Sequence, residues 1–514
     1  MKILVGGLCA VLLAAWMSGR PLIAASSCES MASLALPNAT ITFARTVAAG
    51  GFSPSSPDTP DGSLTPAPAG RVFSALPAFC RVAATLKPSS DSDIKIEVWM
   101  PIANWNGKFE AVGNGAFNGT IAYTAMASAL DRGYATSSTD TGHAGNTASF
   151  ALGHPEKLID FGWRAVHELA AASKTIIAAF YDTRPRWSYW NGCSAGGRQG
   201  LKEAQRFPAD FDGIVAGAPG LDWTGRASQA VRGAQKLRKD EAARLSPAKA
   251  QALHAAVLHA CDALDGVKDG LIGDPTRCTF NPGLLQCKGA DEASCLTPAQ
   301  VDTARMLYSP LINSTTKREV AGLQLGSELG WTALGWTASA RATGLDQFRF
   351  LVFKDPQWDL DQFSAETDLA RAEAADNDTI NALDPDIKAF IDRGGKLIHY
   401  HGWNDPQISP AHSVQYYERA AAMNGTSKVH GSYRLFMVPG MAHCRGGEGP
   451  NTFDMMDALE QWVERGTPPD RIVAAHMGDR GVDRTRPLCP YPQVAVYKGS
   501  GSTDEAANFV CKTR

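Results

Sequence analysis

Apolar positions in the first half of the chain follow two different periods. From residue 94 to 100 they alternate with other residues, which predicts a half-buried strand, and the run at 109–112 predicts a second strand. Between 166 and 180 their spacing is close to the period of an α-helix. Short apolar runs at 187–190 and 214–216 predict two further strands. Strands that alternate with helices indicate an α/β core with a largely parallel sheet.

The middle of the chain, from roughly residue 221 to 385, has a mainly helical pattern. Ser246–Pro247 and Thr297–Pro298 each combine an N-cap residue with a proline for the first turn, which predicts two helix starts. The first of these helices would carry four apolar residues on one face: Leu253, Val257, Cys261 and Leu264.

The strand pattern returns after this segment, at 396–400 and 433–438. A capped helix follows, with apolar positions at Phe453, Met456, Leu459 and Val463, and it ends at Gly466. The pattern therefore predicts one α/β core that is interrupted by a helical insertion.

The N-terminus has the three parts of a secretory signal peptide. Lys2 precedes an apolar stretch at 3–16, and small residues follow at 24–26. The stretch is short for a membrane span, which needs about 20 apolar residues. We therefore predict a signal peptide at 1–25, cleaved rather than retained as an anchor. The mature protein would be secreted or periplasmic, with no membrane segment.

Composition narrows the class of protein. The chain has 514 residues, enough for a core domain and a second module. It carries 49 basic and 52 acidic residues, which gives a net charge of −3. This balance lacks the positive excess of nucleic-acid-binding proteins, and no nucleic-acid partner is expected.

The 11 cysteines form an odd set until export is considered. Cys9 lies in the predicted signal peptide, so the mature chain keeps an even number, which is compatible with five disulfides in an exported protein. Zinc is the competing interpretation. No CxxC motif occurs, and the cysteines from Cys261 to Cys295 lack the paired spacing of zinc ligands.

A nucleophile signature follows the predicted strand at 187–190. Residues 192–196 read Gly-Cys-Ser-Ala-Gly, a G-x-S-x-G motif between a strand and a helix-competent segment. Such a serine occupies a tight elbow, and Gly192 and Gly196 would keep the strand and the helix from colliding. A structural turn is the alternative for the motif by itself.

A serine nucleophile needs a base and an acid that orients the base. Asp405 follows the strand at 396–400, and His443 follows the strand at 433–438. Both positions lie at carboxyl ends of core strands, where open α/β sheets gather their reactive loops. The alternatives are a turn that begins at Asp405 before Pro406, and other histidines close to Asp405: His399, His401 and His412.

Cys193 directly before Ser194, and Cys444 directly after His443, resemble the tannase and feruloyl esterase family. Further motifs of that family follow in the same order over nearly the whole mature chain: 109–119, 192–197, 261–274, 402–406, 439–444 and 491–497. The resemblance implies an α/β-hydrolase core with a large, mainly helical lid domain inserted between nucleophile and acid. The core would occupy 26–220 and 386–514, and the lid 221–385.

The resemblance also implies a disulfide pairing that the sequence alone does not select. The pairs are Cys28–Cys80, Cys193–Cys444, Cys261–Cys278, Cys287–Cys295 and Cys489–Cys511. In the family, the bridge that corresponds to Cys193–Cys444 ties the nucleophile elbow to the histidine loop. A bridge across about 250 residues contributes roughly 5 kcal/mol in the chain-entropy model.

An acidic stretch in the implied lid offers oxygen ligands for a hard cation. Its three carboxylates and two backbone carbonyls could surround calcium: Asp262, Asp265, Asp269, and the carbonyls of Val267 and Leu271. The stretch is not an EF-hand, because Gly273 stands where that motif has a bidentate Glu. From the residues alone a plain Asp/Gly turn is favoured, whereas the resemblance implies a structural Ca²⁺ at these positions.

The implied chemistry is a two-step acyl transfer. His443 would take the proton of Ser194 as the hydroxyl attacks an ester, and Asp405 would orient the imidazole. We expect the Ala195 N–H and the turn at 113–115, with Gly115, to stabilise the oxyanion.

The resemblance implies a small aromatic ester as substrate, such as a feruloyl, galloyl or related phenolic ester. Five aromatic residues of the implied lid could stack on such a ring or form the core of the lid: Trp331, Trp336, Phe348, Phe350 and Trp358. The family also includes a hydrolase of mono(2-hydroxyethyl) terephthalate, with an aromatic residue where this chain has Ile408, which disfavours that substrate. A serine peptidase and a calcium-stabilised binding protein without catalysis are the other classes considered.

Overall fold

The computed structural model describes residues 26–54, 69–331 and 343–513. The predicted signal peptide lies outside the described residues. Within them, no helix is long and apolar enough to cross a membrane.

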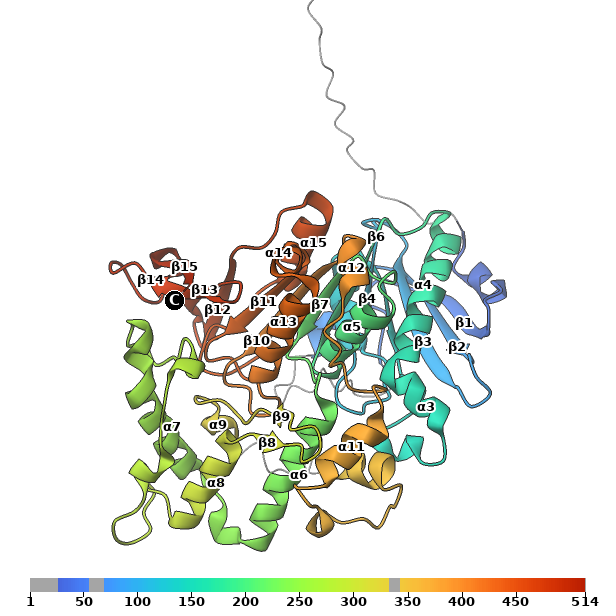
Figure 1. The fold of residues 1–514 in the computed structure, drawn as a ribbon. Helices are drawn as coiled ribbons and strands as arrows, with labels where there is room; N and C mark the ends of the chain where they lie inside the picture. Colours follow the sequence, from blue (N-terminus) through green and yellow to red (C-terminus); the bar gives the residue numbers. More distant parts are fainter. Residues whose placement is uncertain (1–25, 55–68, 332–342, 514) are drawn as a thin grey trace, which may run out of the picture.

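A sheet of nine strands forms the centre of the core (Figure 1). Its order is β1-β2-β3-β5-β4-β6-β7-β10-β11. In that order the strands are β1 (Ala39–Val47), β2 (Phe79–Leu86), β3 (Ile94–Pro101), β5 (Ala135–Thr139), β4 (Lys108–Val112), β6 (Trp187–Cys193), β7 (Gly213–Gly217), β10 (Lys396–Gly402) and β11 (Tyr433–Val438). The pairs from β1 to β5 are antiparallel, and those from β5 to β11 are parallel. The predicted α/β class with a largely parallel sheet is confirmed.

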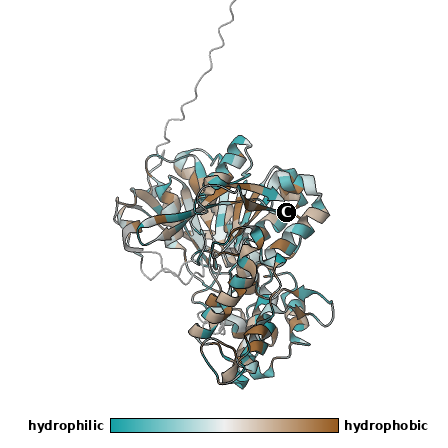
Figure 2. Ribbon diagram, turned by 90° about the vertical axis from the view of Figure 1, so that its left-hand side faces the viewer, coloured by the Kyte–Doolittle hydropathy of each residue, from teal (hydrophilic) through white to brown (hydrophobic). Residues whose placement is uncertain are grey.

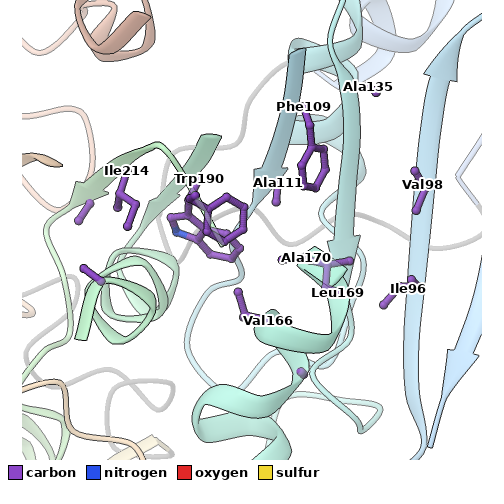
Figure 3. Close-up of a cluster of buried hydrophobic side chains, with 14 of the residues drawn as sticks. Ile96, Val98, Phe109, Ala111, Ala135, Val166, Leu169, Ala170, Trp190 and Ile214 are labelled. Carbon is purple, nitrogen blue, oxygen red and sulfur yellow. The ribbon is translucent and has the colours of Figure 1, made fainter. Parts of the chain in front are cut away.

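Helices cover both faces of this sheet. Successive residues of β10 alternate between two clusters: Leu397 packs in the one that contains Leu169, and Ile398 in the one that contains Leu459. Figure 3 shows the first cluster around Trp190. The longer core helices are α2 (Tyr123–Asp131), α4 (Ala165–Tyr181), α5 (Ala195–Arg206), α13 (Ala411–Asn424) and α15 (Met455–Arg465). The shorter ones are α1 (Ala69–Ser74), α3 (Pro155–Ile159), α12 (Lys388–Asp392) and α14 (Thr426–Ser432).

Most of the chain between β7 and α12, here called the insertion, leaves the sheet and gathers beside its lower edge (Figure 1). Its helices are α6 (Trp223–Lys239), α7 (Pro247–Cys261), α8 (Pro298–Tyr308), α9 (Glu328–Gly330) and α11 (Asp368–Asp376). Its only named strands in the described residues are β8 (Leu311–Ile312) and β9 (Glu319–Val320). Hydrophobic residues occur inside both the core and the insertion (Figure 2). The domain boundaries at 221 and 385 stay a prediction.

Both predicted helix starts in the insertion are confirmed. The Ser246 side chain accepts the Lys249 N–H at the start of α7, and Thr297 forms a capping box with Gln300 at the start of α8. The extension of the apolar face of α7 to Leu264 is wrong. The helix ends at Cys261, and Leu264 is 53% exposed in the following 3-10 turn, which turns it away from Val257.

Two other local predictions need correction. The strand predicted at 94–100 is not half-buried, since the opposite face carries the buried residues Glu97 and Trp99. Glu97 is tolerated there because Arg81 on β2 pairs with it. Phe453 was predicted to lie on the helix that ends at Gly466. It lies before that helix, α15, whose N-cap is Asp454. The sequence did not predict β1, β2, β5 or the two C-terminal hairpins: β12 (Ile472–Gly478), β13 (Gly481–Leu488), β14 (Gln493–Tyr497) and β15 (Phe509–Thr513).

Candidate active site

The elbow between β6 and α5 holds Ser194 in a strained backbone conformation. Its φ of 63° and ψ of −120° lie in a region that costs non-glycine residues about 1–3 kcal/mol. A Cβ at Gly192 would lie 2.6 Å from the backbone of Gly196, so a larger residue cannot occupy that position without moving the helix. The predicted steric role is confirmed for Gly192, whereas a Cβ at Gly196 would meet Gly113 and Asn114 of the neighbouring turn rather than the strand. The Ser194 N–H donates to the Gly217 carbonyl at 2.9 Å, which fixes the elbow against β7.

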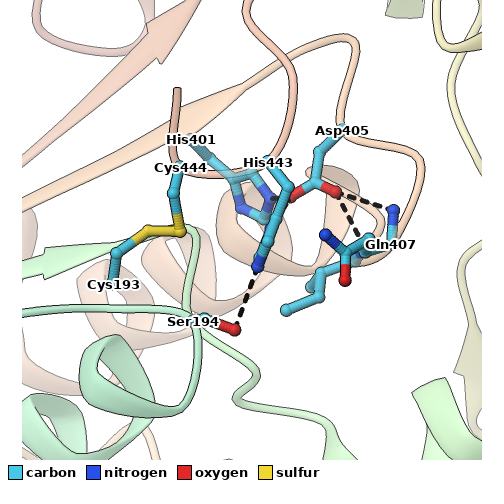
Figure 4. Close-up of a disulfide and its surroundings, with 8 residues drawn as sticks. Cys193, Ser194, His401, Asp405, Gln407, His443 and Cys444 are labelled. Carbon is cyan, nitrogen blue, oxygen red and sulfur yellow. Dashed lines mark hydrogen bonds and ion pairs between the residues drawn. A yellow bond between two sulfur atoms is a disulfide. The ribbon is translucent and has the colours of Figure 1, made fainter. Parts of the chain in front are cut away.

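Three side chains from distant segments meet at this elbow (Figure 4). His443 Nε2 lies 2.9 Å from Ser194 Oγ, and His443 Nδ1 lies 2.6 Å from Asp405 Oδ2. All three residues are buried. Ser194 and Asp405 are therefore each within hydrogen-bond reach of His443, the geometry that serine acyl transfer requires.

The Asp405 carboxylate also forms the turn that follows β10. Its Oδ1 accepts the N–H groups of Gln407 at 2.7 Å and Ile408 at 3.0 Å. The turn at Asp405 is therefore confirmed through Oδ1, while Oδ2 remains available for the predicted contact with His443. Burial opposes ionisation of Asp405, but the charge of His443 and the hydrogen bonds from His401 and His443 outweigh it and hold the pKa well below its usual range.

His401 is a site residue that the sequence interpretation left among the alternatives. Its Nε2 lies 3.0 Å from Asp405 Oδ2, the same oxygen that receives His443. His399 and His401 are two residues apart on β10 and therefore share a face. That spacing is the sequence signal that could have identified them as a pair. His412 instead lies 4.0 Å from Asp222 of the segment before α6.

A disulfide joins the elbow to the histidine loop. Cys193 and Cys444 are separated by 251 residues in sequence and have Cα atoms 6.0 Å apart (Figure 4). Each directly adjoins Ser194 or His443, so the bridge limits how far the two side chains can separate. The other four bridges have the pairing that the resemblance implies: Cys28–Cys80, Cys261–Cys278, Cys287–Cys295 and Cys489–Cys511.

The two predicted oxyanion donors lie beside the elbow. Ala195 is the first residue of α5, where N–H groups have no partner inside the helix. The turn at 113–115 packs directly on the elbow, since a Cβ at Gly113 would lie 2.5 Å from Gly196 Cα. The Gly113 N–H is used by the Asn191 carbonyl, whereas the Gly115 carbonyl accepts from Asn118. The oxyanion role of Gly115 and Ala195 stays a prediction.

Most of the predicted insertion aromatics form its own core. Trp331 packs in one buried cluster, and Phe348 and Trp358 in another. Trp336 lies outside the described residues. Phe350 instead packs against a cluster that includes Ala195.

That cluster was not predicted from the sequence. Phe117 and Phe161 from the core meet Trp223 from α6, with Phe117 and Trp223 in an edge-to-face pair at 5.0 Å. Because the contacts join three separate segments, no local pattern indicates them. They place an aromatic wall beside the first residue of the nucleophile helix.

The acidic loop after α7 is held together by its own backbone. Asp262 accepts the N–H groups of Asp269 and Gly270, and Asp265 accepts that of Val267. Asp269 accepts the Leu271 N–H and pairs with Arg486. The donor set is all oxygen, which fits a hard cation. In the described residues, however, no three acidic, His or Cys side chains converge on one point, and the calcium site stays a prediction.

Comparison with known proteins places this geometry in context. Residues 80–512 match the family model described as tannase and feruloyl esterase. An uncharacterized esterase from Xanthomonas campestris is 38% identical, covering 95% of this chain and 91% of the relative. A probable feruloyl esterase B-1 from Aspergillus fumigatus is 35% identical, covering 84% of this chain and 85% of its own. The crystal structure of feruloyl esterase B from Aspergillus oryzae superposes with a TM-score of 0.85 at 33% identity, over 94% and 99% of the two chains.

Proposed function

This chain belongs to the tannase and feruloyl esterase family and is a carboxylic ester hydrolase, and we propose that it is a secreted serine esterase that acts on aromatic esters. The observation that carries the proposal is the hydrogen-bonded series from Asp405 through His443 to Ser194 on the elbow.

In the proposed mechanism, Ser194 Oγ attacks the ester carbonyl carbon while its proton passes to His443 Nε2. The buried Asp405 carboxylate stabilises the imidazolium that forms. The proton then passes to the leaving alcohol, which departs as the carbonyl re-forms and leaves an acyl-enzyme. Water repeats the sequence: it gives a proton to His443, attacks the acyl carbon, and releases the acid and the free Ser194 hydroxyl.

The oxyanion of each tetrahedral intermediate would accept hydrogen bonds from the Ala195 N–H and from Gly115. The argument for Ala195 is its place at the N-terminus of α5, where free N–H groups and the helix dipole favour negative charge. Removing one such donor typically costs about 10²- to 10³-fold in kcat.

The proposal that the substrate has an aromatic acyl group is based on the wall of Phe117, Phe161 and Trp223 next to Ala195. Aromatic rings attract one another in edge-to-face and offset arrangements beyond their burial of area. Five disulfides support a protein that folds in an oxidising compartment, in agreement with export through a signal peptide at 1–25.

A structural Ca²⁺ in the acidic loop is part of the proposal. Asp262, Asp265 and Asp269, with the carbonyls of Val267 and Leu271, would hold it through oxygen ligands. When bound, the ion neutralises the charge that three neighbouring carboxylates accumulate. No step of the reaction involves it.

A hydrolysis panel tests the substrate class. We expect turnover of methyl ferulate or methyl gallate, with mono(2-hydroxyethyl) terephthalate and a p-nitrophenyl ester as comparison esters and a peptide as the comparison for protease activity. The Ser194→Ala variant serves as the blank and should fold normally but show no turnover. Full activity in Ser194→Ala would remove Ser194 from the nucleophile role, and preferential peptide cleavage would replace the esterase assignment.

A further inference from the structure

We propose that His401 is a positioning residue for the reaction, and that a buried hydrogen-bond chain through Ser413, His399 and Tyr433 holds it in the tautomer that donates to Asp405. The inference rests on the proposed triad. It adds a second histidine that contacts the same oxygen of Asp405 as His443 does.

The chain consists of four consecutive hydrogen bonds between buried side chains. His401 Nε2 lies 3.0 Å from Asp405 Oδ2, and His401 Nδ1 lies 2.6 Å from Ser413 Oγ. Ser413 Oγ lies 2.8 Å from His399 Nε2, and His399 Nδ1 lies 2.8 Å from the Tyr433 hydroxyl. His399, His401, Ser413, Tyr433 and Asp405 all have less than 1% of their surface exposed. Solvent therefore supplies no alternative partner.

The hydrogen-bonding capacity of each group determines which atom is the donor in each of these four hydrogen bonds. An ionised carboxylate only accepts, so His401 Nε2 carries the hydrogen that faces Asp405. Ser413 Oγ lies between His401 Nδ1 and His399 Nε2 and has a single proton to donate, and in the proposed arrangement it donates that proton to His401 Nδ1.

The donors at the Tyr433 end of this hydrogen-bond series follow from the role of Ser413. Because the Ser413 proton is used toward His401, Ser413 Oγ accepts from the Nε2–H of His399. Burial keeps the pKa of His399 well below its usual value, so that ring is neutral and its Nδ1 accepts. Tyr433 supplies the last hydrogen, and burial raises the pKa of its hydroxyl, which keeps the proton in place. Each hydrogen bond in this series therefore has one defined donor. Exchanging donor and acceptor in one bond would require the same exchange in the next.

The charged and titratable groups around Asp405 come from several elements. His401 lies on β10 and His443 on the loop after β11, and Arg226 of α6, in the insertion, interacts electrostatically with the carboxylate. His412 of α13 lies behind His401, next to Asp222, and burial lowers its pKa to about 4, so it is neutral near pH 7. Of these groups, His401 and His443 are the ones that hydrogen-bond the reacting carboxylate oxygen.

The physical consequence concerns the proton affinity of His443. A second N–H on Oδ2 disperses part of the carboxylate charge, so Asp405 stays unprotonated and attracts the His443 proton less strongly. Without His401, Asp405 would direct its full charge toward His443. The acid limb of the kcat/KM profile, which reports protonation of the free enzyme's base, would then move upward.

The experiment compares His401→Phe, which removes the donor, with His401→Gln, whose side-chain amide can place an N–H near the position of Nε2. We expect His401→Phe to lower kcat by about tenfold to 100-fold, the range that corresponds to one hydrogen bond to a charged group, with KM unchanged. The acid limb of its kcat/KM profile should move to higher pH. His401→Gln should recover most of both effects. An unchanged acid limb in His401→Phe, or no recovery in His401→Gln, would overturn the inference and leave only a packing role.

A second readout does not require turnover. In protein labelled with ¹⁵N in the imidazole rings, we expect His401 to carry hydrogen on Nε2 and none on Nδ1, with its signals identified by their loss in His401→Gln. Tyr433→Phe should change the tautomer signals of His399, whereas Tyr181→Phe removes an equally buried hydroxyl that bonds the Pro101 carbonyl and should leave them unchanged. A doubly protonated His401, or hydrogen on its Nδ1, would contradict the assignment.

The nucleophile role of Ser194 and the positioning role of His401 can be disproved independently of each other. Retained turnover in Ser194→Ala would contradict the proposed nucleophile while leaving the tautomer signals of His401 as predicted. Loss of turnover in Ser194→Ala together with a wild-type pH profile in His401→Phe would contradict the positioning role alone.

Discussion

Asp405 and Asp262 begin two acidic turns that use the same local chemistry for different ends. Both carboxylates are buried, and each accepts two backbone N–H groups from its own turn. At Asp262 these bonds occupy both oxygens, one each. At Asp405 both go to Oδ1, which leaves Oδ2 to His401 and His443.

The disulfides beside the two turns also differ in whether they connect local or distant segments. Cys261–Cys278 spans 17 residues and stays local to the acidic loop, whereas Cys193–Cys444 spans 251 residues and joins the segments that carry Ser194 and His443. A carboxylate used entirely by its own loop stabilises that loop. At Asp405 the second oxygen is left for two histidines, one of which also contacts Ser194, and this is the arrangement on which the proposed triad depends.

Replacing one acid of each turn by its amide, Asp405 in the first and Asp269 in the acidic loop, should separate these roles most strongly. Asp405→Asn keeps Oδ1 for the turn but loses the acceptor for His443, so we expect kcat to fall by about 10⁴-fold, as when an orienting acid is lost from a serine triad. The melting temperature should change little. Asp269→Asn should leave kcat unchanged and lower the melting temperature, because its partner Arg486 is buried beside it. Steady-state kinetics and thermal melts measure both, and equal kcat in the two variants would break the comparison.

Removing the two disulfides should also have unequal effects. The Cys193→Ala/Cys444→Ala pair should lower the free energy of unfolding by about 5 kcal/mol and the Cys261→Ala/Cys278→Ala pair by about 3 kcal/mol, because the longer loop restricts the unfolded chain more. Only the first pair should also reduce kcat, since it borders Ser194 and His443. Denaturant unfolding and kinetics at a temperature where both variants are folded would measure this. Unimpaired kcat without Cys193–Cys444 would show that packing alone positions the two residues.

Calcium removal tests the acidic loop by itself. At a calcium concentration 100-fold above its Kd, binding would contribute about 2.7 kcal/mol of stability, so chelation should lower the melting temperature by several degrees. Asp262→Asn should lose most of this dependence, while Asp405→Asn should retain it as the matched control. A wild-type melting temperature that does not change with calcium concentration would contradict the proposed site.

The smallest expected effect concerns a contact between the insertion and the histidine loop. His254 of α7 pairs with Glu328 and with Glu448, a residue of the loop that follows His443. Burial opposes the charge of His254, but its hydrogen bonds to these two carboxylates outweigh burial and raise the pKa to about 9 from 6.5.

A raised pKa stabilises the folded protein fully below about pH 6.5, and this contribution is lost as the pH rises through about 9. We therefore expect the melting temperature to fall by a few degrees over that interval. His254→Gln should remove this part of the decrease, and His476→Gln, a change at a more exposed histidine paired with Asp483, should not. Identical pH profiles of melting for wild type and His254→Gln would exclude the contribution.

The predictions that succeeded from sequence depend on neighbours along the chain. The caps at Ser246 and Thr297, the close approach at Gly192 and the positions of six of the nine core strands follow from turn chemistry and hydrophobic period. The family resemblance additionally supplied the disulfide pairing, which local pattern leaves open. Leu264 was misplaced because the helical period was extended beyond the residue where α7 ends.

The remaining features depend on which distant segments the fold brings together. The alternating pattern on β10 placed His399 and His401 on one face, but only the packing of α13 and β11 against it supplied Ser413 and Tyr433 as partners. The wall of Phe117, Phe161 and Trp223 likewise joins core and insertion.

The sequence by itself determined the α/β core with its helical insertion, the nucleophile elbow and the two candidate partners of Ser194. The tertiary structure decided which histidines meet Asp405 and which aromatic residues lie beside Ala195. The physical reason is range: backbone period, caps and turns are determined within a few residues, whereas a hydrogen bond between buried side chains depends on the register of strands far apart in sequence.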